Sequence, residues 1–172
     1  MTSKREYPER PVVGVGGVTI HDGRALLIRR GCEPLKGEWS IPGGTLELGE
    51  TIAEGVVREL REETGLEVKV LDLIEVFERI FPDPAESQTA VEDTGAAHNP
   101  SGRAPETPAR PQYHFVILDY LCERVAGTPR AGSDVTDLAF ARDDELAHYH
   151  LTPTATRVLR KAFALSRERA AP

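Results

Sequence analysis

The chain has 172 residues, of which 40% are hydrophobic and 28% charged, and its formal net charge is −7. This length and composition fit one globular domain, so we expect residues 1–172 to form a single domain. The acidic balance and the lack of a long basic run exclude a sequence-independent binder of nucleic acid, and we predict no nucleic-acid partner. No apolar run approaches the roughly 18 residues of a membrane span, which predicts no association with a membrane.

The first residues of the chain and its cysteines predict where in the cell the protein resides. The first ten residues, MTSKREYPER, contain no apolar run of the kind found in a secretory signal. Cys32 and Cys122 are the two cysteines and stand far apart in the sequence. We interpret them as reduced thiols, and we expect a cytoplasmic protein.

Secondary structure can be predicted in chain order from turns and periodicity. Alternating Val and Gly over Pro11–Ile20, the turn His-Asp-Gly-Arg and the apolar run Ala25–Arg30 predict a β-hairpin. Glycines and prolines then recur from 31 to 49, which predicts a loop that turns repeatedly. A capping box, Thr51 to Glu54, predicts the start of a helix, and Gly65 its end. Beyond it we expect strands at Val68–Phe81, Tyr113–Cys122 and Asp137–Ala141, a short helix at Arg142–His148 and an amphipathic helix at Thr152–Arg169.

The negative charge is concentrated in two segments. Gly44–Leu66 contains six glutamates against two arginines, and Pro82–Pro111 contains five acidic residues against two arginines. The second segment is rich in proline and has Val91 as its one large aliphatic residue. Such a segment buries too little apolar area to offset its ordering entropy, so we predict a loop insertion at about 82–111 between two strands.

The glutamates of the first segment fall at unusual positions on the predicted helix. At about 100° per residue, Glu59 and Glu63 lie on the edge of the stripe formed by Ile52, Val56 and Leu60, and Glu62 lies about 60° from Glu59. Carboxylates there lose hydration, repel one another and meet the negative end of the helix dipole. Bound Mg²⁺ or Mn²⁺ would offset these costs. A neighbouring arginine, Arg58, can hold one carboxylate in a bidentate pair.

Taken as a whole, the segment GTLELGETIAEGVVRELREETGL at 44–66 resembles the Nudix box, with every defining position matched. The approach WSIPGG at 39–44 and the order of elements also look like that family. The resemblance implies an α/β fold, the Nudix-type α/β/α sandwich with a mixed β-sheet. It further implies hydrolysis of a nucleoside diphosphate linked to another group, with Mg²⁺ as cofactor and Mn²⁺ as a substitute. It is also compatible with a homodimer.

Carried over position by position, the resemblance assigns roles to box residues. It makes Glu59, Glu62 and Glu63 metal ligands and catalytic residues, and it makes Arg58 the side chain that orients a glutamate. Gly44 would open the loop beside the helix and contact substrate, while Glu50 and Gly65 would be structural. The general base stays open among Glu62, Glu63, Asp134, Asp137, Glu92 and Asp93.

Two residues outside the box are candidates for substrate binding. Arg29 and Arg30 end a strand that points toward the box loop, and alternation allows only one of them to face a given side. That arginine can contact a phosphate or close a salt bridge, and we choose Arg30 as the candidate for substrate binding. Trp39 is the sole tryptophan. It can pack near a base or ribose, or it can anchor the loop in the core.

Three functions fit these features. The approach to the box and the strand YHFVILDY at 113–120 look like bacterial ADP-ribose pyrophosphatase-type members of the family. We therefore expect cleavage of ADP-ribose, or of a nucleoside diphosphate sugar, to a nucleoside monophosphate and a sugar phosphate. One alternative is a house-cleaning pyrophosphatase for (d)NTPs. The other is a regulatory domain that binds a nucleotide without hydrolysing it, against which the complete set of box glutamates argues.

Overall fold

A computed structural model describes residues 5–83, 110–132 and 134–170 of the chain. The predicted insertion at 82–111 lies outside these residues except for its two ends. Contacts divide the chain into two units, residues 1–12 with 78–116 and residues 13–77 with 117–172. The single-domain expectation is not tested by this division and stays a prediction. Within the described part of the chain, no helix combines the length and the apolar character that crossing a bilayer requires.

The strands of the fold follow the predicted order. They are β1 (Val12–His21), β2 (Arg24–Arg30), β3 (Trp39–Ser40), β4 (Gly43–Thr45), β5 (Glu67–Phe81), β6 (Tyr113–Ala126) and β7 (Val135–Ala141). They form one sheet in the order β3-β2-β1-β6-β5, with β4 paired to β1 and β7 paired to β2. The predicted hairpin is confirmed, because β1 and β2 are antiparallel with Ile20 opposite Ala25. The short strands β3 and β4, within the predicted loop, were not foreseen.

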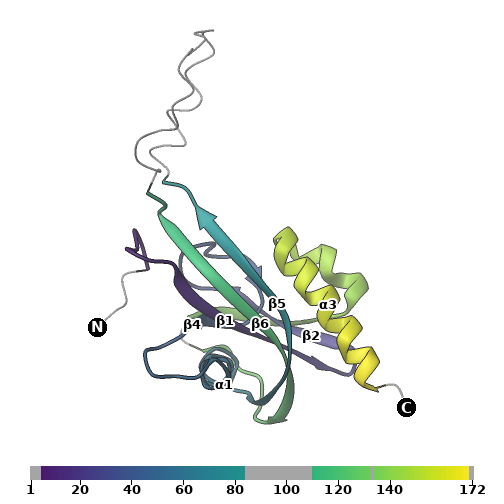
Figure 1. Ribbon diagram of the computed structural model, residues 1–172. Helices are drawn as coiled ribbons and strands as arrows, with labels where there is room; N and C mark the ends of the chain where they lie inside the picture. Colours follow the sequence, from purple (N-terminus) through teal and green to yellow (C-terminus); the bar gives the residue numbers. More distant parts are fainter. Residues whose placement is uncertain (1–4, 84–109, 133, 171–172) are drawn as a thin grey trace. The chain divides into compact units, whose positions relative to one another are not determined.

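The helices are α1 (Ile52–Thr64), the 3-10 helix η1 (Asp143–Tyr149) and α3 (Pro153–Ala170). In the larger unit, α1 and α3 lie on opposite faces of the sheet (Figure 1), which confirms the predicted α/β/α layering. The predicted short helix at 142–148 is a 3-10 helix displaced by one residue.

Two apolar clusters hold these layers together. One packs α3 and η1 against the sheet through Val158, Leu159 and Leu27. The other packs α1 through Val56 and Leu60 against Leu26 and Val15. Leu26 and Leu27 are neighbours on β2 but belong to different clusters, because successive side chains of a strand point to opposite faces. The sheet therefore has a buried layer on each side.

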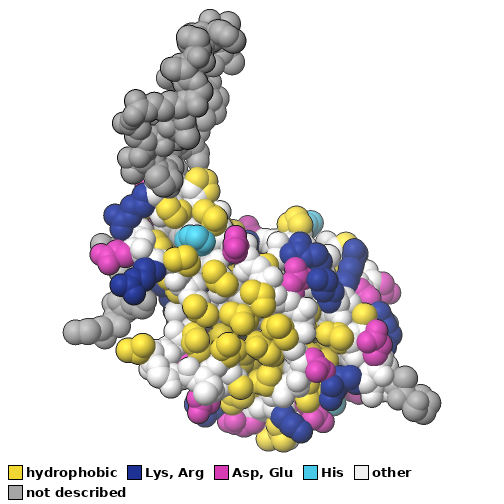
Figure 2. Space-filling model, in the orientation of Figure 1, with side chains coloured by type: hydrophobic (Ala, Val, Ile, Leu, Met, Phe, Trp, Pro, Cys, Tyr) yellow, Lys and Arg dark blue, Asp and Glu magenta, His cyan; other side chains and the backbone are white. Residues whose placement is uncertain are grey.

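The sheet also keeps some apolar surface exposed. Leu73 and Val76 on β5 are 47% and 50% exposed. Figure 2 shows apolar side chains gathered over the middle of the face that it draws. The expected homodimer stays a prediction.

The smaller unit is held by polar and aromatic contacts. The backbone N–H of Tyr7 donates to the carbonyl of Gln112 at 2.7 Å, and the Gln112 amide donates to the Glu6 carboxylate at 2.8 Å. The ring of Tyr113 lies 5.9 Å from Phe81 and 6.0 Å from Phe115, centroid to centroid. These contacts fix residues 5–7 beside the start of β6 and bring the end of β5 against it.

Candidate functional site

The site is built on α1, whose ends form as predicted. The Thr51 hydroxyl accepts from the N–H of Glu54 at 3.3 Å, and the Glu54 carboxylate accepts from the N–H of Thr51 at 2.8 Å. At the other end, Gly65 adopts the left-handed conformation with φ of 70° and donates to the carbonyl of Arg61 at 2.9 Å. Both ends of the helix are thus fixed by the local sequence.

Glu59 is a buried carboxylate at the rim of the apolar side of α1. Val56 and Leu60 on either side of it are fully buried, and Glu59 itself is 8% exposed. Its carboxylate lies against the backbone of Gly44, where an added Cβ would stand 2.4 Å from the Glu59 carboxyl carbon. A glycine is therefore required at 44, because any side chain would push Glu59 away from the loop.

Arg58 is the centre of the charged network. Its guanidinium holds Glu50 in a bidentate pair, with N–O distances of 2.6 and 3.0 Å, and also donates to the carbonyl of Thr45 at 3.0 Å. A further donor lies 2.9 Å from Glu59 and 3.4 Å from Glu62. The expected bidentate pair thus exists with Glu50. One guanidinium ties the box loop to the helix and orients Glu59.

The pKa values in this network shift as the contacts require. The hydrogen bonds from Arg58 and from the Glu47 backbone lower the pKa of Glu50 to about 2. The carboxylate of Glu50 raises the pKa of Arg58, which stays fully charged. Glu50 and Arg58 therefore form an ion pair at neutral pH that ties the loop to the helix, and the purely structural role of Glu50 stays a prediction.

Glu63 is the second carboxylate that faces the loop. It accepts a hydrogen bond from the backbone N–H of Gly43 at 2.7 Å. Burial raises its pKa to about 8 against that hydrogen bond, and the charge of Glu59 adds to the rise. The positive charge of Arg30 lowers the pKa of Glu63, whereas the negative charge of Asp134 raises it. Glu63 is a largely buried acid whose ionised form lacks a sufficient counter-charge.

Glu62 differs from the other two glutamates. Its side chain is 57% exposed, and its contact with the network is the one with Arg58 at 3.4 Å. In the described residues, no three acidic, histidine or cysteine side chains converge as a ready metal centre. The donors still suit a hard divalent cation, because they are carboxylate oxygens, with Glu59 buried and Glu63 half-buried close to each other.

The end of β2 and the following loop adjoin this cluster. Arg29 donates to the carbonyl of Gly37 at 2.9 Å, and Arg30 donates to the carbonyl of Pro34 at 2.8 Å. Both arginines therefore brace the loop from 31 to 38. Of the two, Arg30 is half-buried and its charge acts on Glu63, and its role in binding substrate stays a prediction.

Trp39 lies beside the α3 cluster. Its ring meets that of Tyr149 edge-on at 5.3 Å, and it packs against the apolar core beneath α3. This contact supports the anchoring role that we weighed for Trp39, and its role in binding substrate stays a prediction.

The candidate bases are distributed differently. Asp134, just before β7, and Asp137, within β7, are both exposed. The carboxylate of Asp137 accepts from the backbone of Leu138 at 2.9 Å, whereas Asp134 influences Glu63 electrostatically. Glu92 and Asp93 lie outside the described residues. Sequence reasoning missed the Gly43 N–H as a partner of Glu63, because no sequence pattern reports a backbone donor across a loop.

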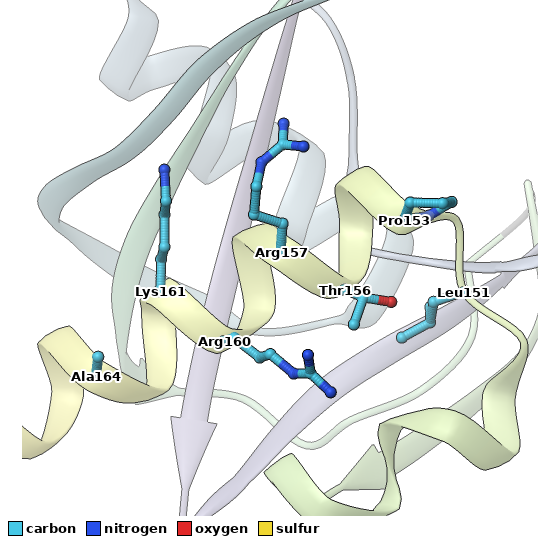
Figure 3. A pocket seen from close by; sticks show the side chains of 7 residues that line it. All are labelled: Leu151, Pro153, Thr156, Arg157, Arg160, Lys161 and Ala164. Atoms are coloured by element: carbon cyan, nitrogen blue, oxygen red, sulfur yellow. The ribbon is translucent and has the colours of Figure 1, made fainter.

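A shallow hollow on α3 contains no box residue. It is lined by Arg157, Arg160 and Lys161 together with Thr156, Leu151, Pro153 and Ala164 (Figure 3). Arg157 and Lys161 project toward the same side of the helix, where both contact Glu75 at 2.8 Å, while Arg160 projects elsewhere. Two cations of the hollow, Arg157 and Lys161, are thus already paired with Glu75.

Comparison with known proteins gives consistent results. The family model described as NUDIX domain matches residues 9–161. An ADP-ribose pyrophosphatase of Methanocaldococcus jannaschii is 47% identical over 130 residues, which cover 76% of this chain and 61% of that relative. The chain thus spans about three fifths of the length of this curated relative. The nucleoside triphosphatase NudI of Escherichia coli is 29% identical over 81% of this chain and 88% of that protein. The crystal structure of a MutT NUDIX hydrolase from Burkholderia pseudomallei superposes with a TM-score of 0.66 at 28% identity, covering 89% of this chain and 98% of that one.

Proposed function

The chain belongs to the Nudix family, and we propose that it hydrolyses a nucleoside diphosphate linked to a sugar, with ADP-ribose as the first substrate to test. The observation that carries the proposal is the approach of two carboxylates to the box loop, where buried Glu59 lies against Gly44 and half-buried Glu63 accepts from the N–H of Gly43. Buried carboxylates with a surplus of negative charge call for a cation, and a diphosphate is an anion that such a cation would attract.

The bond that breaks is the phosphoric anhydride. Water adds to one phosphorus, the bridging P–O bond breaks, and the leaving phosphate keeps the electron pair. A carboxylate accepts the proton that water loses. The products are a nucleoside monophosphate and a sugar phosphate, and no other reactant is needed.

Each residue of the network has a part in this reaction. Glu59, Glu62 and Glu63 would hold Mg²⁺, for which Mn²⁺ would substitute. When bound, the cation neutralises phosphate charge and lowers the pKa of water. Arg58 keeps Glu59 oriented, Gly44 allows Glu59 to approach the loop, and Arg30 faces the diphosphate from the end of β2. Glu63, Glu62 and Asp134 remain the described candidates for the base near the cluster.

One observation favours a second function. NudI is matched over 88% of its length, a larger share than the ADP-ribose pyrophosphatase relative offers. Hydrolysis of a (d)NTP to a monophosphate and pyrophosphate is therefore the alternative, and the same carboxylates would serve it.

Product identification separates the two functions. The protein is incubated with Mg²⁺ and either ADP-ribose or each (d)NTP, and the products are resolved by chromatography. We expect AMP and ribose 5-phosphate from ADP-ribose, and no reaction when the cation is chelated. Release of pyrophosphate from (d)NTPs without cleavage of ADP-ribose would replace the first function by the second. No hydrolysis of any diphosphate would contradict both.

A further inference from the structure

The connection between β6 and β7 contacts the end of α1 through its backbone. The structure describes residues 127–132 and 134 of this connection. The N–H of Gly132 donates to the carbonyl of Glu63 at 2.9 Å, and the N–H of Arg130 donates to the carbonyl of Thr64 at 2.9 Å. The last carbonyls of a helix have no partner within the helix, so these two bonds complete the end of α1.

Glycines make this contact close. A Cβ added to Gly132 would stand 1.9 Å from the carbonyl oxygen of Glu62, and one added to Gly127 would stand 2.3 Å from that of Gly65. Gly65 in turn lies against Arg130, whose Cγ would be 2.8 Å from an added Cβ. At Gly127 and Gly132 backbone thus meets backbone, and at Gly65 the Arg130 side chain fills the contact. Such close packing leaves little freedom for sliding.

The other end of the connection meets the strand that carries Arg30. The N–H of Gly31 donates to the carbonyl of Asp134 at 2.8 Å, and a Cβ on Gly31 would come within 2.8 Å of the same oxygen. Arg30 then pairs with Val135 in the ladder between β2 and β7. One short segment therefore joins the two places from which Glu63 and Arg30 reach the site.

The contact also has an electrostatic consequence. Glu62 and Glu63 lie at the C-terminal end of α1, where the helix dipole disfavours negative charge. Backbone N–H groups from the connection bring positive partial charge to that end. They compensate for part of the cost of placing carboxylates there, and they do so without adding a side chain to the site.

We propose that the β6–β7 connection is a positioning clamp, with Gly132 fixing the metal-binding glutamates and Gly31 fixing Arg30 at a set separation. The clamp rests on the proposed function, because it needs the glutamates to bind a cation and Arg30 to bind the diphosphate. Its residues do not touch substrate. They act through Glu63 and Arg30.

The first test is the variant Gly132→Ala. Its Cβ forces the end of α1 to move, and we expect the dissociation constant for Mn²⁺, measured by electron paramagnetic resonance, to rise about tenfold. Gly23→Ala is the matched control, because Gly23 in the β1–β2 turn has φ of 70° and no atom within 4 Å of an added Cβ. It should lose thermal stability and bind Mn²⁺ as the wild type does. Unchanged Mn²⁺ binding in a folded Gly132→Ala protein would overturn the proposal.

The second test is Gly31→Ala. This change moves β2 relative to the connection, so we expect the KM for the diphosphate substrate to rise by at least about fivefold while Mn²⁺ affinity is retained. A loss of kcat and of Mn²⁺ affinity with an unchanged KM would contradict the assignment of this end of the clamp to Arg30.

A measurement on the wild type removes any dependence on variant folding. If the clamp orders the cation site, cation binding must in turn order the clamp. Metal-free protein titrated with Mg²⁺ should therefore show slower hydrogen exchange at the amides of Arg130 and Gly132. Unchanged exchange on Mg²⁺ binding would overturn the clamp. Failure of the proposed function gives a different result, in which neither the wild type nor Glu63→Gln binds Mn²⁺ or Mg²⁺.

Discussion

The helices α1 and α3 lie on opposite faces of one sheet and carry charge in opposite arrangements (Figure 1). On α1 a single cation, Arg58, contacts three carboxylates, Glu50, Glu59 and Glu62. On α3 two cations, Arg157 and Lys161, share the single carboxylate of Glu75. Each cluster is therefore unbalanced, one negative and the other positive.

Burial separates the two clusters. The side chains of Arg58 and Glu59 are 16% and 11% exposed, although Glu62 is 57% exposed. Those of Arg157 and Lys161 are 49% and 50% exposed, although the Glu75 that they share is 14% exposed. Water solvates the surplus positive charge on α3, and such pairs contribute little to stability. On α1 we propose that a bound cation compensates for the surplus negative charge. Burial, more than the count of charges, distinguishes a functional cluster from a structural one.

The largest loss of activity is expected at the negatively charged cluster of α1, where Glu59 is buried. Glu59→Gln keeps the shape of the side chain and a hydrogen-bond acceptor for Arg58 but removes one negative charge. We expect kcat for the diphosphate substrate to fall by about 10²–10⁴-fold, because the site loses a ligand of the cation. Circular dichroism should show an unchanged fold. Wild-type activity in this variant would exclude Glu59 from the metal site.

The second effect concerns the space that Glu59 needs. Gly44→Ala places a methyl group 2.4 Å from the Glu59 carboxyl carbon, so the carboxylate must move. We expect the free energy of unfolding to fall by about 1–3 kcal/mol and activity by at least about tenfold. Gly23→Ala serves as the control, with a stability loss of about 1 kcal/mol and full activity. Equal activity in the two variants would contradict the account.

The third effect is a pH dependence of stability. The pKa of Glu50 is lowered from 4.5 to about 2 by Arg58. A lowered pKa contributes stability that is present above pH 4.5 and is lost as the pH falls toward 2. Glu50→Gln should therefore be less stable than the wild type at pH 7 in urea unfolding. The difference should shrink between pH 4.5 and 2, and a difference independent of pH would show that the ion pair is not its cause.

The smallest effect is expected on α3. Glu75→Gln breaks the pairs with Arg157 and Lys161, whose cations remain accessible to water. The free energy of unfolding should change by at most about 1 kcal/mol, and hydrolytic activity should stay at the wild-type level. A large loss of activity in this variant would remove the distinction between the two clusters.

Sequence reasoning succeeded where the cause is local. The ends of α1 follow from Thr51, Glu54 and Gly65, which act within a few residues of one another. Helical periodicity placed Glu59 and Glu63 at the buried edge, and the structure confirms it for Glu59 at 8% exposure. The α/β class was expected from the resemblance of residues 44–66 to the Nudix box.

Sequence reasoning did not predict the contacts between groups that are distant in sequence. The bidentate partner of Arg58 is Glu50, eight residues earlier, because the loop folds back over the helix. The N–H of Gly43 donates to the Glu63 carboxylate, 20 residues later, and the N–H of Gly132 donates to the carbonyl of Glu63, which is far from it in sequence. Backbone donors look alike in every sequence, so only the folded chain reveals them.

The central claim is that the buried carboxylates of α1 bind a divalent cation and the exposed charges of α3 do not matter for it. Calorimetric titration with Mn²⁺ of the wild type, Glu59→Gln and Glu75→Gln at one pH tests it most directly. We predict saturable binding to the wild type and to Glu75→Gln, with affinity lost or strongly reduced in Glu59→Gln. Equal affinity in Glu59→Gln and the wild type would contradict the claim.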